Sequence, residues 1–118
     1  MYGIHQIVVA LCFHLIDMLT GLIGAVKNHE LSSVKMRDGI FKKFGFILCY
    51  VLAFMVDTQQ DVIGFHLDTN ILPIIVTYAV TTEVVSVIEN ITKINPDLLP
   101  EKLTSFFNLK EGDKDGEH

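Results

Sequence analysis

The positive charges of this chain are confined to two blocks of sequence. One block lies within residues 27–43 and the other within residues 93–114, so residues 1–26 and 44–92 contain no lysine or arginine. The apolar residues concentrate in these same cation-free stretches. An average soluble domain is about one quarter charged, whereas 19% of this chain is charged and 50% is hydrophobic. The pattern indicates a membrane protein.

Length and charge exclude several other classes. A chain of 118 residues has room for a single domain, which we place at residues 1–109, with a charged tail at residues 110–118. A net charge of -5 argues against nucleic-acid binding, which needs a basic face. No metal-ligand, nucleophile or phosphate-loop motif occurs, and Cys12 and Cys49 lie in apolar stretches, where a thiol packs as a small apolar group. We therefore expect no enzyme, no metal and no cofactor.

Two apolar segments in the first half of the chain are expected to cross a bilayer. The first covers residues 4–26, with Asp17 as its one charged residue, and exceeds the roughly 20 residues that a spanning helix needs. The second has an unbroken apolar run of 13 residues, 44–56, which reaches only about 20 Å as a helix. It spans the bilayer if the helix covers residues 39–56 and Lys42 and Lys43 snorkel to the interface.

A third apolar segment covers residues 71–91 and contains Glu83 and Glu89. A carboxylate at the bilayer centre costs at least ~2.5 kcal/mol, so this segment either spans or lies in the interface as an amphipathic helix. The sequence thus predicts an all-α membrane protein with about three transmembrane helices and a short acidic C-terminal tail that we expect to be flexible.

The connections between these segments predict the orientation. The first connection contains five cations and the second, residues 57–70, contains three aspartates and no cation. The positive-inside rule places the cationic connection in the cytoplasm, so three spans put the N-terminus outside and the C-terminus inside. A cleaved signal peptide at residues 1–26 is the competing interpretation, but its first six residues carry no cation and Asp17 interrupts its apolar region. The topology-setting cations are Lys27, Lys35, Arg37, Lys42 and Lys43.

Polar and small residues inside the first segment share one helical face, because they recur at spacings of three and four. Small residues allow close helix approach, and an aspartate at this depth needs a partner, water or a proton. We interpret the set as a helix contact or a water-facing surface. Its members are Asp17, Thr20, Gly21, Gly24 and Ala25.

A second polar stripe follows the third segment. It faces the interface, a seam between helices or the wall of a water-filled opening, and the spacing fits each of these interpretations. The stripe comprises Thr82, Ser86, Glu89 and Lys93, with Glu83 and Asn90 beside it.

Three blocks of sequence also form recognisable motifs in order along the chain. They are Asp-x-x-Thr-Gly at residues 17–21, a loop pattern with Ser32, Ser33, Gly39 and Lys43, and Glu-x-x-Ser-x-x-Glu-Asn at residues 83–90. Together these blocks resemble the small phage holins of the toxin-secretion and phage-lysis type, over most of the chain.

That resemblance implies a homo-oligomer in the bacterial cytoplasmic membrane that forms non-specific lesions and releases an endolysin or a large toxin. The chain departs from the family in the short segment before Asp17 and in residues 110–118, which carry two cations and four acids where a basic end is expected. An antiholin is therefore an alternative, as is a membrane regulator or scaffold that forms no pore. A soluble α-helical module with a buried dimer core is a further alternative.

Overall fold

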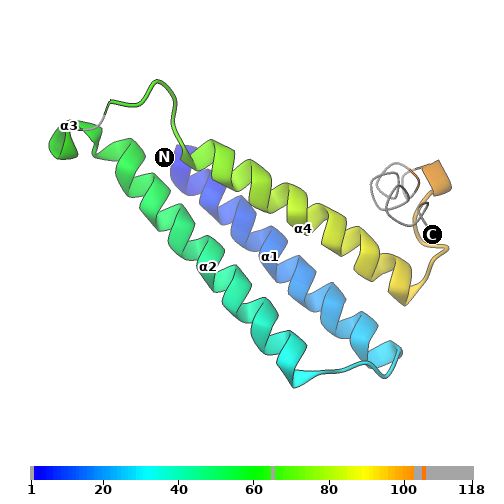
Figure 1. Cartoon of the computed structure of the whole chain (residues 1–118). Coiled ribbons are helices and arrows are strands. Elements are labelled where there is room, and N and C mark those ends of the chain that lie inside the picture. The colour runs from blue at the N-terminus through cyan, green and yellow to red at the C-terminus, as the bar shows by residue number, and fades with distance from the viewer. Residues whose placement is uncertain (1, 65, 103–104, 106–118) are drawn as a thin grey trace, which may run out of the picture.

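Three long helices run side by side in the computed structural model, which describes residues 2–64, 66–102 and 105. They are α1 (Tyr2–Lys27), α2 (Ser33–Thr58) and α4 (Leu72–Ile94), and a single turn, α3 (Gln60–Ile63), follows α2. Helices α1 and α4 run in the same direction and α2 runs in the opposite one (Figure 1). The described residues contain no strand, so the predicted all-α class is confirmed. The acidic tail, residues 110–118, lies outside the described part of the chain.

Each long helix is long and apolar enough to cross a membrane. Helix α2 nevertheless begins at Ser33, whereas the predicted second span begins at residue 39. The Ser32 hydroxyl caps α2 by accepting a hydrogen bond from the Lys35 backbone N–H at 3.3 Å. Hydropathy marks where a helix enters the hydrocarbon, whereas capping decides where the helix starts. The polar first turns of α2 therefore extend the helix beyond its apolar run.

Asp57 joins the end of α2 to the start of α4. Its Oδ1 accepts the backbone N–H of Ile71 at 2.9 Å and its Oδ2 accepts that of Leu72 at 2.8 Å. These are donors that the first turn of a helix leaves without an intrahelical partner, and Pro73 in the same turn needs no such partner. The acidic connection is thereby tied to both helices that it links.

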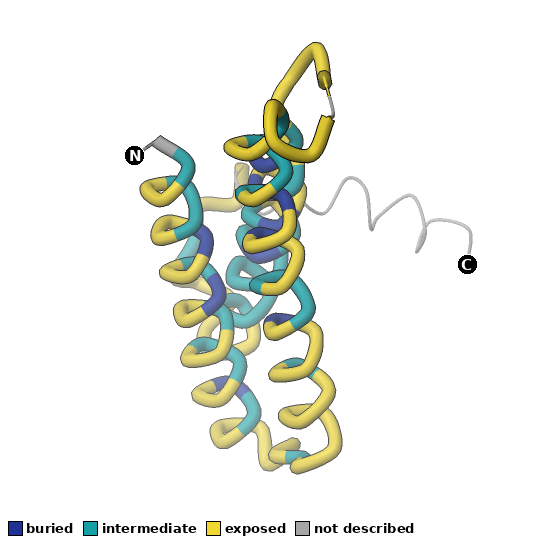
Figure 2. The backbone as a smooth tube through the Cα atoms, turned by 90° about the vertical axis from the view of Figure 1, so that its left-hand side faces the viewer, coloured by how far each residue is buried: buried dark blue, intermediate teal, exposed yellow. Residues whose placement is uncertain are grey.

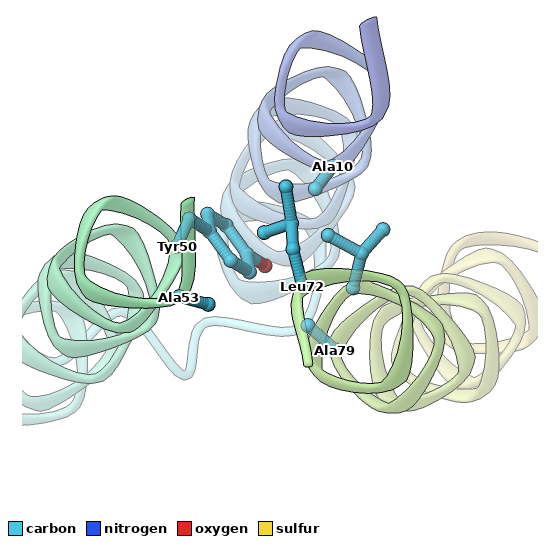
Figure 3. Packing of buried hydrophobic residues seen from close by; sticks show 6 residues of the cluster. Ala10, Tyr50, Ala53, Leu72 and Ala79 are labelled. Atoms are coloured by element: carbon cyan, nitrogen blue, oxygen red, sulfur yellow. The ribbon is translucent and has the colours of Figure 1, made fainter. Parts of the chain in front are cut away.

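The apolar core is small and lies between the three long helices. Most large apolar side chains point outward instead; Leu15 is 57% exposed and Leu52 is 64% exposed, and exposed positions follow the outer sides of the helices (Figure 2). A surface of this kind is expected to face lipid, since exposing it to water would be costly. The core consists of Ala10, Tyr50, Ala53, Leu72, Val76 and Ala79 (Figure 3).

Helix α1 packs more extensively against α4 than against α2. Two glycines of α1 make this approach possible. A Cβ atom on the buried Gly24 would lie 3.7 Å from the Asn90 carbonyl oxygen and from Lys93 Cβ, and one on Gly21 would lie 3.4 Å from Asn90 Nδ2. A larger side chain at either position would meet α4. The close approach places the polar residues of α1 and α4 within hydrogen-bonding distance.

Candidate functional site

A buried cluster of charged side chains connects the three long helices. Lys43 of α2 donates a hydrogen bond from Nζ to Asp17 Oδ2 of α1 at 2.7 Å, and its Nζ lies 3.1 Å from Glu83 Oε2 of α4. The side chains of these three residues are 11%, 12% and 3% exposed, respectively. Opposite charges attract far more strongly in a medium of low dielectric than in water. The cluster therefore holds three helices together through one ammonium group.

His14 and Tyr50 extend the cluster along the helices. His14 Nδ1 lies 2.7 Å from Glu83 Oε2, and His14 Nε2 lies 2.8 Å from the Tyr50 hydroxyl. A neutral imidazole with its proton on Nδ1 satisfies both contacts, because Nδ1 then donates to the carboxylate and Nε2 accepts from the phenol. The ring of Phe46 stacks on His14 at a centroid distance of 5.5 Å. The imidazole is thus held in place from three sides.

Asn90 joins α4 to α1 about two turns beyond Glu83 along α4. Its Nδ2 donates to Asp17 Oδ1 and to Thr20 Oγ1, both at 3.1 Å. The Thr20 hydroxyl donates in turn to the Ile16 carbonyl at 2.8 Å. Within the described residues, every buried side-chain nitrogen and oxygen has a hydrogen-bond partner. The network is therefore closed within one chain, as buried polar groups require.

The charges of this network do not cancel when His14 is neutral. Asp17 and Glu83 then contribute two negative charges against the one positive charge of Lys43, which leaves a net charge of one negative unit. Because ionisable groups inside membrane helices are costly and usually functional, these residues form the candidate functional site.

The inward-facing residues of each helix recur with alternating spacings of four and three. In α1 these residues are 10, 14, 17, 21 and 24; in α2 they are 39, 43, 46, 50, 53 and 57; in α4 they are 72, 76, 79, 83, 86 and 90. Such spacing keeps one seam directed at the neighbouring helices of a left-handed bundle. Sequence reasoning missed the roles of His14 and Tyr50, and this heptad spacing is the signal that would have found them.

The structure brings together several of the residues that the sequence singles out. Asp17, Thr20, Glu83 and Asn90 belong to the network, and Gly21 and Gly24 lie at the contact between α1 and α4. His14 does not pair with Asp17, one turn away on its own helix, but with Glu83. Glu83 and Asn90 therefore face the inside of the single chain.

Other predicted residues lie elsewhere on the bundle. Ala25 and Ser86 line a cavity beside the network. The Thr82 hydroxyl donates to the Tyr78 carbonyl of its own helix. Glu89 is half-buried, and its backbone carbonyl accepts from the Thr92 hydroxyl.

The topology-setting cations do not all behave alike. Lys35, Arg37 and Lys42 are exposed on the first half of α2, and Lys27 Nζ donates to the Ile94 carbonyl. The expectation that Lys43 snorkels to the interface is wrong, because its side chain turns inward and the residue is 9% exposed. Two carboxylates on neighbouring helices lie within its reach, and pairing with them satisfies the ammonium group without water.

Three apolar helices with outward apolar side chains and an inward polar network define a multi-pass membrane protein. Residues 2–111 match the model of the bacteriophage holin family, and the chain belongs to that family. Holins are non-enzymatic membrane proteins.

Two similar proteins come from Listeria. The uncharacterized protein Lin0175 of Listeria innocua is 27% identical over 113 residues, which cover 93% of this chain and 76% of that protein. The uncharacterized protein Lmo0128 of Listeria monocytogenes is 26% identical over 113 residues, with the same coverage of both chains. No solved structure matches the chain.

Proposed function

We propose that this protein is a holin that self-associates in the bacterial cytoplasmic membrane and opens non-specific lesions. The lesions would release a phage endolysin to the cell wall or let a large toxin leave the cell. Membership of the bacteriophage holin family over residues 2–111 is the observation that carries the proposal. In this role the protein binds no nucleic acid, needs no cofactor and catalyses no reaction.

The buried network supports a lesion that opens only when many copies have accumulated. In the single chain, Lys43, Asp17 and Glu83 are paired away from lipid, so a closed bundle is stable in the bilayer. A water-filled opening needs polar walls, and the polar groups that would form them lie in this network. Separating the paired polar groups of one chain in lipid is costly. If several copies assemble around a shared water-filled opening, water hydrates these groups and replaces the partners they have lost. We therefore expect lesions to form abruptly, once the density of the protein in the membrane passes a threshold.

The orientation of the proposed holin follows from its charges. The end of the bundle that holds the α1–α2 connection is rich in cations, and the other end carries Asp57, Asp61 and Asp68. The positive-inside rule then places the N-terminus outside and the C-terminus inside.

A second candidate function is that of an antiholin, or of another membrane regulator that forms no pore. The same closed network favours it, because every buried polar side-chain group in the described residues already has a partner. Such a protein would insert and associate with other copies without opening.

Induced expression in bacteria that also produce an endolysin without an export signal distinguishes the two functions. A holin halts growth after a delay, collapses the membrane potential and releases the endolysin. Asp17→Asn should insert normally and shift or abolish the onset, because Asp17 bonds to both Lys43 and Asn90. If the wild-type protein accumulates to high density with the potential intact, the holin proposal is rejected. A delay of lysis by a co-expressed authentic holin would then identify an antiholin.

A further inference from the structure

We infer that the cavity beside the buried network binds one anionic phospholipid. The inference is independent of lesion formation, since a holin and an antiholin would use such a site equally. The cavity has a volume of about 400 Å³ and opens between α1, α2 and α4 next to the connection at residues 28–32.

The charges around the cavity favour an anion. Lys35 and Lys93 line it and are exposed, and Glu30 is the acid on the same rim. Lys43 and Asp17 also line the cavity, but they are paired with each other. Counted over all the lining residues, three lysines stand against two acids, which leaves an excess of one positive charge; Glu83, the second acid of the network, does not line the cavity. A neutral or cationic head group would leave this excess unbalanced.

The walls of the cavity favour a ligand that also has an apolar part. Met18, Leu22, Met36 and Ile40 line it together with three small residues of α1 and α2. Ligand pockets typically have volumes of roughly 300–1,000 Å³ and mostly apolar walls. A cavity of about 400 Å³ accepts a glycerol phosphate group and the upper part of one acyl chain. The remainder of the lipid would stay in the surrounding bilayer.

The charged and apolar residues of the cavity are ordered along the helices as the head group and acyl chain are ordered in a lipid molecule. Lys35 is the third residue of α2 and Lys93 is the last but one of α4, so both lie at helix ends, where lysines meet lipid head groups. Met18 and Gly21 lie further inside α1, at the level of the acyl chains. An anion at the rim joined to an apolar chain below it is the chemistry of an anionic phospholipid. Free phosphate would leave the apolar walls unfilled.

The first test measures which lipid the purified protein retains. The full chain is transferred from micelles containing equal amounts of phosphatidylglycerol and phosphatidylcholine, and bound lipid is counted by native mass spectrometry. We expect one phosphatidylglycerol per chain in preference to phosphatidylcholine. Lys35→Gln and Lys93→Gln should each weaken this binding about fivefold, the usual effect of one lysine near anionic lipid. Lys42→Gln is the matched control, because Lys42 is exposed on α2 and does not line the cavity.

The second test fills the cavity without touching a charge. A Cβ atom on Gly39 meets nothing within 4 Å, and Gly39 lines the cavity, so Gly39→Leu should fold and exclude the lipid. Gly45→Leu is its control, since Gly45 also has open space and lies outside the cavity. Equal retention of both lipids, unchanged retention in Gly39→Leu, or full displacement of the lipid by glycerol 3-phosphate would each overturn the inference. Because lysis is not measured, these outcomes do not depend on the proposed function.

Discussion

At the scale of single residues, Lys43 is the group on which the buried cluster depends. It contacts Asp17 and Glu83 from the middle of α2, and each of these carboxylates has a second polar partner, Asn90 and His14 respectively. Without Lys43, two carboxylates would face each other inside the bundle. A buried ion pair adds little net stability compared with apolar residues, but losing one partner is strongly destabilising. The contribution of Lys43 should therefore appear mainly when it alone is removed.

We predict that Lys43→Met lowers the free energy of unfolding by about 3–5 kcal/mol, measured by denaturation in micelles with circular dichroism. Lys42→Met is the control and should change it by less than about 0.5 kcal/mol, as is usual for an exposed position. Adding Asp17→Asn and Glu83→Gln to Lys43→Met should recover most of the loss, since no unpaired charge then remains. If Lys43→Met and Lys42→Met behave alike, the cluster does not stabilise the fold.

At the scale of helices, the close contact of α1 with α4 depends on Gly24. This glycine is buried, and the space beside it is bounded by the backbone of Asn90 and the side chains of Lys93 and Ile94. Backbone atoms cannot move aside as a flexible side chain can. A branched side chain at this position would push the two helices apart and lengthen the hydrogen bonds from Asn90 to Asp17 and Thr20.

We predict that Gly24→Ile lowers the free energy of unfolding by about 1–3 kcal/mol, the usual cost of overfilling a packed site. The same denaturation measurement in micelles tests it. Gly45→Ile is the matched control, because a Cβ on Gly45 meets nothing within 4 Å, and it should leave stability unchanged or raise it. Equal stability of the two variants would show that α1 and α4 do not rely on close approach at Gly24.

At the scale of the whole molecule, the two ends of the bundle differ in charge. The α1–α2 connection and the end of α4 lie at one end, and the α2–α4 connection lies at the other (Figure 1). The first end carries cations on Lys27, Lys35 and Lys93, whereas the second carries aspartates. Since positively charged connections stay in the cytoplasm, this asymmetry predicts one orientation for all three helices.

We predict that a single cysteine at Asp61 reacts with an impermeant thiol reagent in intact cells, whereas one at Arg37 or Asp97 is protected. The background replaces Cys12 and Cys49 by alanine, and labelling after the cells are opened controls for accessibility. Reaction at Arg37 with protection at Asp61 would invert the orientation. Reaction at both Asp61 and Asp97 would mean that α4 does not cross the membrane.

The three apolar helices and the separation of charge between their connections could be predicted from the amino-acid sequence. Both follow from local composition, because a cation-free apolar segment in lipid satisfies its backbone polar groups as a helix. The sequence also showed that Asp17 needs a partner or water. It placed the start of the second span at residue 39, because hydropathy reports membrane depth and not the capping at Ser32.

The partners of the buried polar side chains could not be predicted from the sequence and are seen only in the folded bundle. The structure pairs Asp17 with Lys43 and Asn90, and pairs His14 with Glu83, 69 residues away along the chain. Partner choice depends on how the helices are rotated and how closely they approach, and this is set by packing at Gly24 and along the heptad seams. The local sequence around a polar residue does not specify its partner, because the partner lies on another helix and the contact exists only once the two helices have packed together.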